Sequence, residues 1–167
     1  AEHIAKIFDD KNILLLANTN AAKNNLQDRI NNAFCDCYTV HDYIKNKNSN
    51  KIYDLVIVDE CSTVCNEDIL QLFEKCNSEA YLLLGDIHQI EAIKFGNWFN
   101  FARYFIEKNS VYELSIPYRA KNNNTLLDMW SYVRHYDENM FERLQANGYI
   151  STLDESIFEK TEDEIIL

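Results

Sequence analysis

Two adjacent acids, Asp59 and Glu60, directly follow a short apolar stretch that ends at Val58. Such a stretch is typical of a strand buried on both faces of a parallel sheet, and ligands bind where the strands of such a sheet end. One carboxylate at that edge can hold Mg²⁺ through its water shell, and the next can orient or deprotonate an attacking water. The pair therefore fits nucleotide hydrolysis, and a solvated acidic turn is the equal alternative on these two residues alone.

A second apolar run, residues 80–84, leads into Gly85 and Asp86, and Gln89 follows three residues later. The Gln89 amide could hydrogen-bond both a phosphate oxygen and the attacking water. This second acidic strand end favours hydrolysis over the solvated turn.

A third stretch, residues 112–114, is predicted to be a strand and is followed by Tyr118 and Arg119. The Arg119 guanidinium could supply positive charge to a phosphoryl group in transfer, as arginine fingers do. The order of acid pair, Gly-Asp-x-x-Gln and Tyr-Arg is much more specific than any one of its parts.

From about residue 13 to residue 119, this order resembles the first motor domain of superfamily 1 helicases, which are RecA-like ATPases that move along nucleic acid. The resemblance implies that Asp59 binds Mg²⁺ through water and that Glu60 positions the attacking water. It also implies that Gln89 and Arg119 meet the γ-phosphate of ATP, so Glu60, Gln89 and Arg119 are the predicted catalytic residues. The residues predicted to bind the ATP cofactor are Asp59, Gly85, Asp86, Gln89, Tyr118 and Arg119.

The segment at residues 14–22 looks like the family's motif Ia, which implies contact of Thr19 and Asn20 with a single strand of DNA or RNA. Thr39 and His41 look like the Thr-x-His segment that follows it, with the same implication. A His that opens an amphipathic helix more often serves as a local hydrogen-bond partner, and we favour that interpretation of His41. Ala21 stands where the family usually has Lys, which removes one expected phosphate contact.

No Gly-x-x-x-x-Gly-Lys-Ser/Thr loop occurs in the chain, which has only three glycines. A helix predicted at residues 2–9 begins without a cap and looks cut just past that loop, and the apolar run at 165–167 simply stops. We therefore expect an internal piece of a longer protein, inactive by itself. The strand leading into the loop should lie beside the strand of the acid pair, so its loss predicts a gap filled by another segment, a partner chain or self-association of the fragment.

The coarse pattern alternates strands with helices, which predicts an α/β fold: a RecA-like parallel sheet of the P-loop NTPase type, with helices on both faces and incomplete at both ends. We expect a partial motor domain at residues 1–122, a helical appendage at 123–150, and at 151–167 a linker and the start of a second motor domain. An aromatic stripe at Trp98, Phe99, Phe101 and Phe105 is assigned to core packing. The predicted strands are 12–17, 35–39, 53–59, 80–85 and 111–114, and the predicted helices are 2–9, 20–32, 40–46, 66–76, 97–108, 123–136 and a short one within 137–150.

Composition sets further limits. A chain of 167 residues that is 47% apolar can bury one core. The five cysteines show no Cys-x-x-Cys pairing, which favours reduced thiols over a structural zinc site. Since no stretch approaches a membrane span and no signal peptide opens the chain, we expect a cytoplasmic protein without a membrane partner.

The formal net charge of −11 argues against tight, non-specific nucleic-acid binding by this piece alone, since Lys and Arg supply that affinity. The acidic balance and Ala21 favour an alternative: a helicase-derived interaction or scaffold module without catalysis. The presence of Asp59, Glu60, Gln89 and Arg119 favours a fragment of an ATP-dependent helicase or translocase, since a scaffold needs none of them.

Overall fold

The chain forms two compact units, residues 1–112 and 113–167. The computed structural model describes residues 4, 7–8, 10–30, 34–46, 51–88, 94, 96–114, 124–135 and 137–148. The first unit contains, in chain order, β1 (Ile13–Ala17), α2 (Asn20–Arg29), β2 (Cys35–Thr39), α3 (Val40–Asn46), β3 (Ile52–Tyr53), β4 (Leu55–Val58), the 3₁₀ turn η1 (Cys61–Thr63), α4 (Asn66–Lys75), β5 (Asn77–Ser78), β6 (Tyr81–Leu83), α5 (Trp98–Ala102) and the 3₁₀ turn η2 (Lys108–Ser110).

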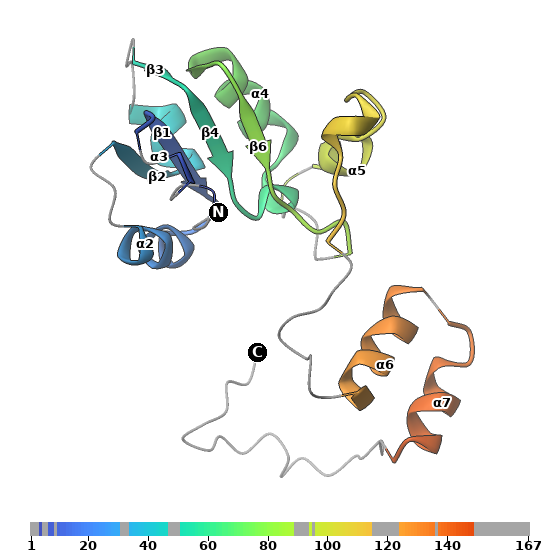
Figure 1. The fold of residues 1–167 in the computed structure, drawn as a ribbon. Helices are drawn as coiled ribbons and strands as arrows, with labels where there is room; N and C mark the ends of the chain where they lie inside the picture. The colour runs from blue at the N-terminus through green and yellow to red at the C-terminus, as the bar shows by residue number, and fades with distance from the viewer. Residues whose placement is uncertain are drawn as a thin grey trace. The chain divides into compact units, whose positions relative to one another are not determined.

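The centre of the first unit is a sheet of four parallel strands in the order β2-β1-β4-β6 (Figure 1). Ile13 of β1 is in register with Cys35 of β2 on one side and with Leu55 of β4 on the other. The prediction of a mixed α/β fold built on a parallel sheet is therefore confirmed.

Buried side chains cover both faces of the sheet. Every residue of β1 is fully buried, and successive side chains of a strand point to opposite faces. On one face Leu14 and Leu16 pack with apolar residues of α3 and α4. On the other face Ile13 and Leu15 pack with Ile30, which ends α2. Helices therefore lie on both faces, as the continuous apolar strands predict.

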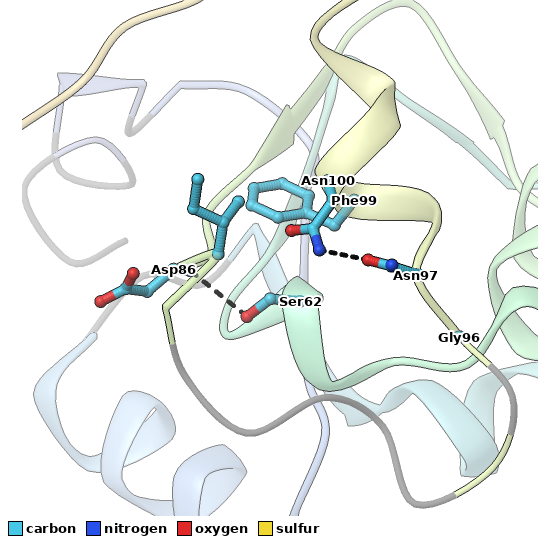
Figure 2. Close-up of a pocket in the computed structure, with 7 residues that line it drawn as sticks. Ser62, Asp86, Gly96, Asn97, Phe99 and Asn100 are labelled. Carbon is cyan, nitrogen blue, oxygen red and sulfur yellow. Dashed lines mark hydrogen bonds between the residues drawn. The ribbon is translucent and has the colours of Figure 1, made fainter. Parts of the chain in front are cut away.

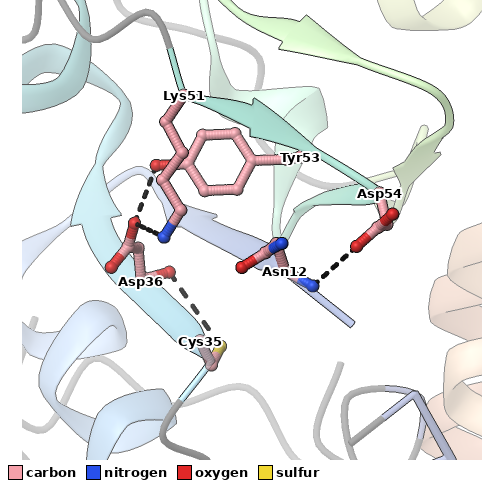
Figure 3. Close-up of polar contacts among 6 residues, drawn as sticks. All are labelled: Asn12, Cys35, Asp36, Lys51, Tyr53 and Asp54. Atoms are coloured by element: carbon pink, nitrogen blue, oxygen red, sulfur yellow. Dashed lines mark hydrogen bonds and ion pairs between the residues drawn. The ribbon is translucent and has the colours of Figure 1, made fainter. Parts of the chain in front are cut away.

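The predicted strand at 53–59 is two strands. β3 pairs with β5, whereas β4 pairs with β1 and β6, and the change of partner falls at Asp54. The Asp54 amide donates to the Asn12 carbonyl at 3.0 Å, and its carboxylate accepts from the Asn12 amide at 2.7 Å (Figure 3). This local exchange with Asn12 separates the small β3–β5 sheet from the central one.

The strand order predicted from the resemblance is wrong. β4 is hydrogen-bonded to β1 on one side and to β6 on the other, so the sheet is continuous from β2 to β6. No gap is left beside β4, and the expected unpaired neighbours are absent there. A strand that leads into a phosphate loop would have to lie outside β2 or β6.

Two element predictions between residues 97 and 114 are also wrong. The helix predicted to reach residue 108 ends at Ala102, because the amides of Tyr104 and Phe105 bond to carbonyls three residues back and so form tight turns. Residues 111–114 form no strand, and Leu114 is 91% exposed. An apolar run cannot become a strand without a neighbouring strand to take up its backbone hydrogen bonds.

The aromatic stripe of α5 is only half buried, so its assignment to the core is wrong for the second half. Trp98 donates its ring N–H to the Val64 carbonyl at 2.8 Å and packs edge to face on Phe99. Phe101 and Phe105 are 56% and 87% exposed. The helix is too short to carry all four rings onto the sheet.

The described part of the second unit contains two helices, α6 (Asn124–Arg134) and α7 (Met140–Ala146), as predicted for this part of the chain. Arg143 of α7 joins them: its Nε lies 3.1 Å from a carboxylate oxygen of Asp137, and its guanidinium lies 5.4 Å from the ring centre of Tyr132. The predicted division at residue 122 stays a prediction.

None of the described helices is both long and apolar enough to cross a membrane. The five cysteines are free thiols; Cys61, Cys65 and Cys76 are buried, whereas Cys35 and Cys37 are half-buried. Of the predicted helix at 2–9, only residues 4, 7 and 8 are described; the Phe8 amide donates to the Ile4 carbonyl at 3.2 Å, as in a helical turn.

Candidate functional site

The carboxyl ends of the four parallel strands define one edge of the sheet. Asp59 and Glu60 follow β4, and Gly85 and Asp86 lie just beyond β6. Thr19 lies two residues after the end of β1. Thr39 ends β2, Asn20 begins α2 and His41 lies in the first turn of α3. All the described residues that were predicted to form the site therefore lie along this edge, whereas Gln89, Tyr118 and Arg119 lie outside the described residues.

The acid pair occupies a tight turn between neighbouring strands. The Asp59 amide donates to the Leu16 carbonyl of β1 at 2.8 Å, and the Cys61 amide donates to the Leu84 carbonyl after β6 at 2.8 Å. Glu60, between them, has φ of 52° and ψ of 38°, the left-handed conformation. Asp59 is half-buried and Glu60 is exposed. Backbone bonds to both adjacent strands thus fix the two residues that carry the carboxylates.

Cys61, directly after the pair, is a core residue and not a reactive thiol. Its side chain is fully buried. Burial raises the pKa of the Cys61 thiol to about 12, and the charges of Asp59 and Glu60 act in the same direction. A thiol with such a pKa stays protonated near neutral pH and is a poor nucleophile. The chemistry of this turn therefore belongs to the carboxylates.

Gly85 allows the backbone after β6 to lie close to the backbone of Ser62, just after the acid pair. A Cβ at this position would lie 2.9 Å from Cε1 of Phe99 and 2.9 Å from the amide nitrogen of Ser62. The Asp86 amide donates to the Ser62 hydroxyl at 3.2 Å, and the Asp86 carboxylate accepts from the His88 amide at 2.9 Å. The Gly-Asp turn is therefore held directly against the turn that follows the acid pair.

A small hollow lies beside these contacts (Figure 2). Its volume of about 10 Å³ gives room for about one water molecule, so it is far too small for a nucleotide. The Asn100 amide donates to the Asn97 side-chain oxygen across its rim. Of the lining residues, the sequence pattern predicted only Asp86 as a site residue and assigned Phe99 to core packing; the position of Ser62, two residues after the acid pair, was the available signal for one of the others. The lining residues are Ser62, Asp86, Ile87, Gly96, Asn97, Phe99 and Asn100.

The two threonines predicted to touch nucleic acid cap helices. Thr19 Oγ1 accepts from the Ala22 amide at 3.1 Å at the start of α2, and Thr39 Oγ1 accepts from the Asp42 amide at 3.1 Å at the start of α3. Thr39 is only 5% exposed, whereas Asn20 and His41 are exposed. A role in nucleic-acid contact stays a prediction for all four.

Among the described residues, no three His, Cys, Asp or Glu side chains are grouped so that they could hold a metal ion by themselves. Mg²⁺ is usually bound through one or two carboxylates, several waters and the phosphates of a substrate. Asp59, a single half-buried carboxylate at the strand end, fits that mode of binding.

A parallel sheet with helices on both faces and an acid pair at its carboxyl edge is consistent with a P-loop NTPase. Comparison with protein families agrees with this class: the family described as AAA domain matches residues 2–155, so the chain belongs to that family. Such P-loop domains bind and hydrolyse nucleoside triphosphates. A search of curated proteins found no match to the chain.

Proposed function

We propose that this chain is part of the first motor domain of a superfamily 1 helicase or translocase, which hydrolyses ATP to move along single-stranded DNA or RNA. The observation that carries the proposal is the position of Asp59 and Glu60 in a hydrogen-bonded turn at the carboxyl end of a central strand. The turn has the motif Ia-like segment after β1 on one side and the Gly-Asp turn after β6 on the other. Helicase motors need these three groups at one sheet edge.

In this proposal Asp59 holds Mg²⁺ through water, and the ion supplies charge neutralisation to the phosphates of ATP. Glu60 orients the attacking water and accepts its proton. Glu60 is an exposed residue at this edge, where the proposed role requires it to meet a water and a nucleotide. The chain itself contains no phosphate-cradling loop, so another part of the same protein would supply it.

The remaining roles rest on the resemblance. Gln89 and Arg119 would contact the γ-phosphate, and Tyr118 would stack on the adenine. The second motor domain would close over the nucleotide from the other side. Nucleic acid would contact the surface near Asn20 and His41, and the net charge of −11 implies that its affinity comes from a local surface and from other parts of the protein.

The proposal predicts nucleic-acid-stimulated ATP hydrolysis by the whole gene product. The substitution Glu60→Gln should lower kcat by about 100-fold or more, because it removes the proton acceptor and keeps the shape of the side chain. ATP binding should persist in this variant, and Asp59→Asn should weaken binding of Mg²⁺ with ATP. Steady-state ATPase assays and nucleotide titrations measure both effects.

The same assay separates the proposal from a scaffold without catalysis. A whole gene product that binds no ATP and hydrolyses none, with or without single-stranded DNA and RNA, would contradict the proposal. Ser78→Ala is a suitable control, since Ser78 lies in β5, outside the proposed site, and its hydroxyl donates to the Ala80 carbonyl at 2.8 Å.

A further inference from the structure

The backbone of Glu60 adopts a conformation that the residue does not favour by itself. Its φ is 52°, and it is the one non-glycine residue with a positive φ among those described. For a residue with a Cβ the left-handed region is unfavourable, and such residues keep it only when their surroundings hold them there. Contacts around Glu60 must therefore impose the direction in which its side chain leaves the turn.

Two hydrogen bonds from Thr63 hold the carbonyl group of Glu60. The Thr63 hydroxyl donates to this carbonyl at 2.7 Å, and the Thr63 amide donates to the same oxygen at 3.0 Å. The amide bond belongs to the 3₁₀ turn and would form with many residues at position 63. The hydroxyl bond depends on the side chain of Thr63.

Asn18 holds Thr63 in turn. Its side-chain amide donates to the Thr63 hydroxyl at 2.9 Å and to the Thr63 carbonyl at 3.1 Å. Asn18 directly follows β1, and Thr63 lies 45 residues later in the chain. Because the Thr63 hydroxyl donates its proton to Glu60, it accepts from Asn18, so the three groups form one directed chain of hydrogen bonds.

We propose that Asn18 and Thr63 are positioning residues for Glu60: their side chains clamp the end of β1 onto the acid turn and so fix the left-handed backbone that aims the carboxylate. The consequence for catalysis rests on the proposed function, whereas the clamp itself does not. Asn18 lies within the motif Ia-like segment 14–22, but the sequence pattern assigned no role to Asn18 or to Thr63. Neither side chain needs to touch ATP, since both act through the backbone of Glu60.

The kinetic test uses the whole gene product. Thr63→Val keeps the shape of the side chain and removes its hydroxyl, so kcat for ATP should fall about tenfold or more while KM changes by less than about twofold, since misplacement of a reacting group slows chemistry strongly. Thr63→Ser restores the hydroxyl and should recover kcat. Asn18→Ala should lower kcat in the same way, and Ser78→Ala should leave it unchanged.

A double variant distinguishes positioning from a general loss of structure. In a Glu60→Gln background, Thr63→Val should cause no further decrease in kcat, because the carboxylate that it positions is already absent. A further tenfold decrease would show that Thr63 acts elsewhere and would overturn the inference. So would full activity of Thr63→Val in a protein that Glu60→Gln inactivates.

A whole gene product that hydrolyses no ATP would contradict the proposed function but would not test the clamp. A crystal structure tests the clamp independently of activity. A crystal structure of the Thr63→Val variant should show Glu60 outside the left-handed region or its carboxylate turned from the wild-type direction. An unchanged Glu60 in both the Thr63→Val and Asn18→Ala structures would overturn the inference.

Discussion

Gly85 illustrates how one missing side chain lets two turns of the site touch. An added Cβ would lie 2.9 Å from both Phe99 Cε1 and the amide nitrogen of Ser62, and the second of these is backbone and cannot rotate away. Gly85→Ala should therefore destabilise the protein by about 1–3 kcal/mol, as overpacking does. Urea unfolding of the two proteins measures the difference.

The Phe99→Leu background tests that explanation. Removing the ring relieves one of the two close contacts, so Gly85→Ala should cost less there than in the wild-type protein. An equal cost in both backgrounds would contradict a role for the ring. The backbone contact with Ser62 should keep some cost in either case.

At the scale of elements, a polar cluster ties β3 to β2 at the opposite edge of the sheet (Figure 3). One carboxylate oxygen of Asp36 in β2 accepts from the Tyr53 hydroxyl at 2.8 Å and from Lys51 Nζ at 2.8 Å. Tyr53 is fully buried, whereas the Lys51 side chain is 39% exposed. The Asp36 carboxylate thus accepts hydrogen bonds from a buried tyrosine and from a solvent-exposed lysine.

Tyr53→Phe should destabilise the protein by about 1–3 kcal/mol, because it removes a hydrogen bond to a charged group from a buried position. Lys51→Met should cost about 1 kcal/mol or less, since exposed ion pairs contribute little. Unfolding in urea at low and high salt compares the two. A larger loss for Lys51→Met than for Tyr53→Phe would contradict this ranking.

At the scale of the whole molecule, thiol and phenol groups with raised pKa values make the free energy of unfolding depend on pH in the alkaline range. Burial raises the pKa of the Cys61 thiol from 9.0 to about 12 and that of Cys35 likewise to about 12, and burial with the hydrogen bond to Asp36 raises the pKa of Tyr53. Above pH 9 the unfolded thiols lose their protons while the folded ones keep them. Stability from these thiols is therefore fully present below pH 9 and is lost as pH rises toward 12.

The free energy of unfolding should consequently fall above pH 9, with a slope of up to about 1.4 kcal/mol per pH unit for each such thiol. Cys61→Ala should make this slope shallower, whatever it does to stability at pH 7. Urea unfolding at a series of pH values measures the slope. An unchanged slope in the Cys61→Ala and Cys35→Ala proteins would contradict the assignment.

The sequence predicts the central sheet well because its two inner strands, β1 and β4, are largely buried on both faces. β1 is an unbroken apolar run, and its burial is complete. The acids after β4 and the Gly-Asp turn after β6 follow from the same pattern, since parallel strands end at one edge. Residues 111–114 also contain apolar residues, yet they form no strand. A strand needs a neighbouring strand for its backbone hydrogen bonds, and the local sequence pattern does not reveal whether one is present.

The sequence by itself thus determined the fold class, the acid pair and the edge at which that pair lies. The tertiary structure alone decided the order of the strands, the exposure of Phe101 and Phe105, and the contacts of Asn18 and Ser62 with the acid turn and the Gly-Asp turn. The physical reason is the separation along the chain over which each kind of interaction acts. Apolar periodicity and turn residues act between near neighbours in the chain, whereas these contacts join residues 24 and 45 positions apart.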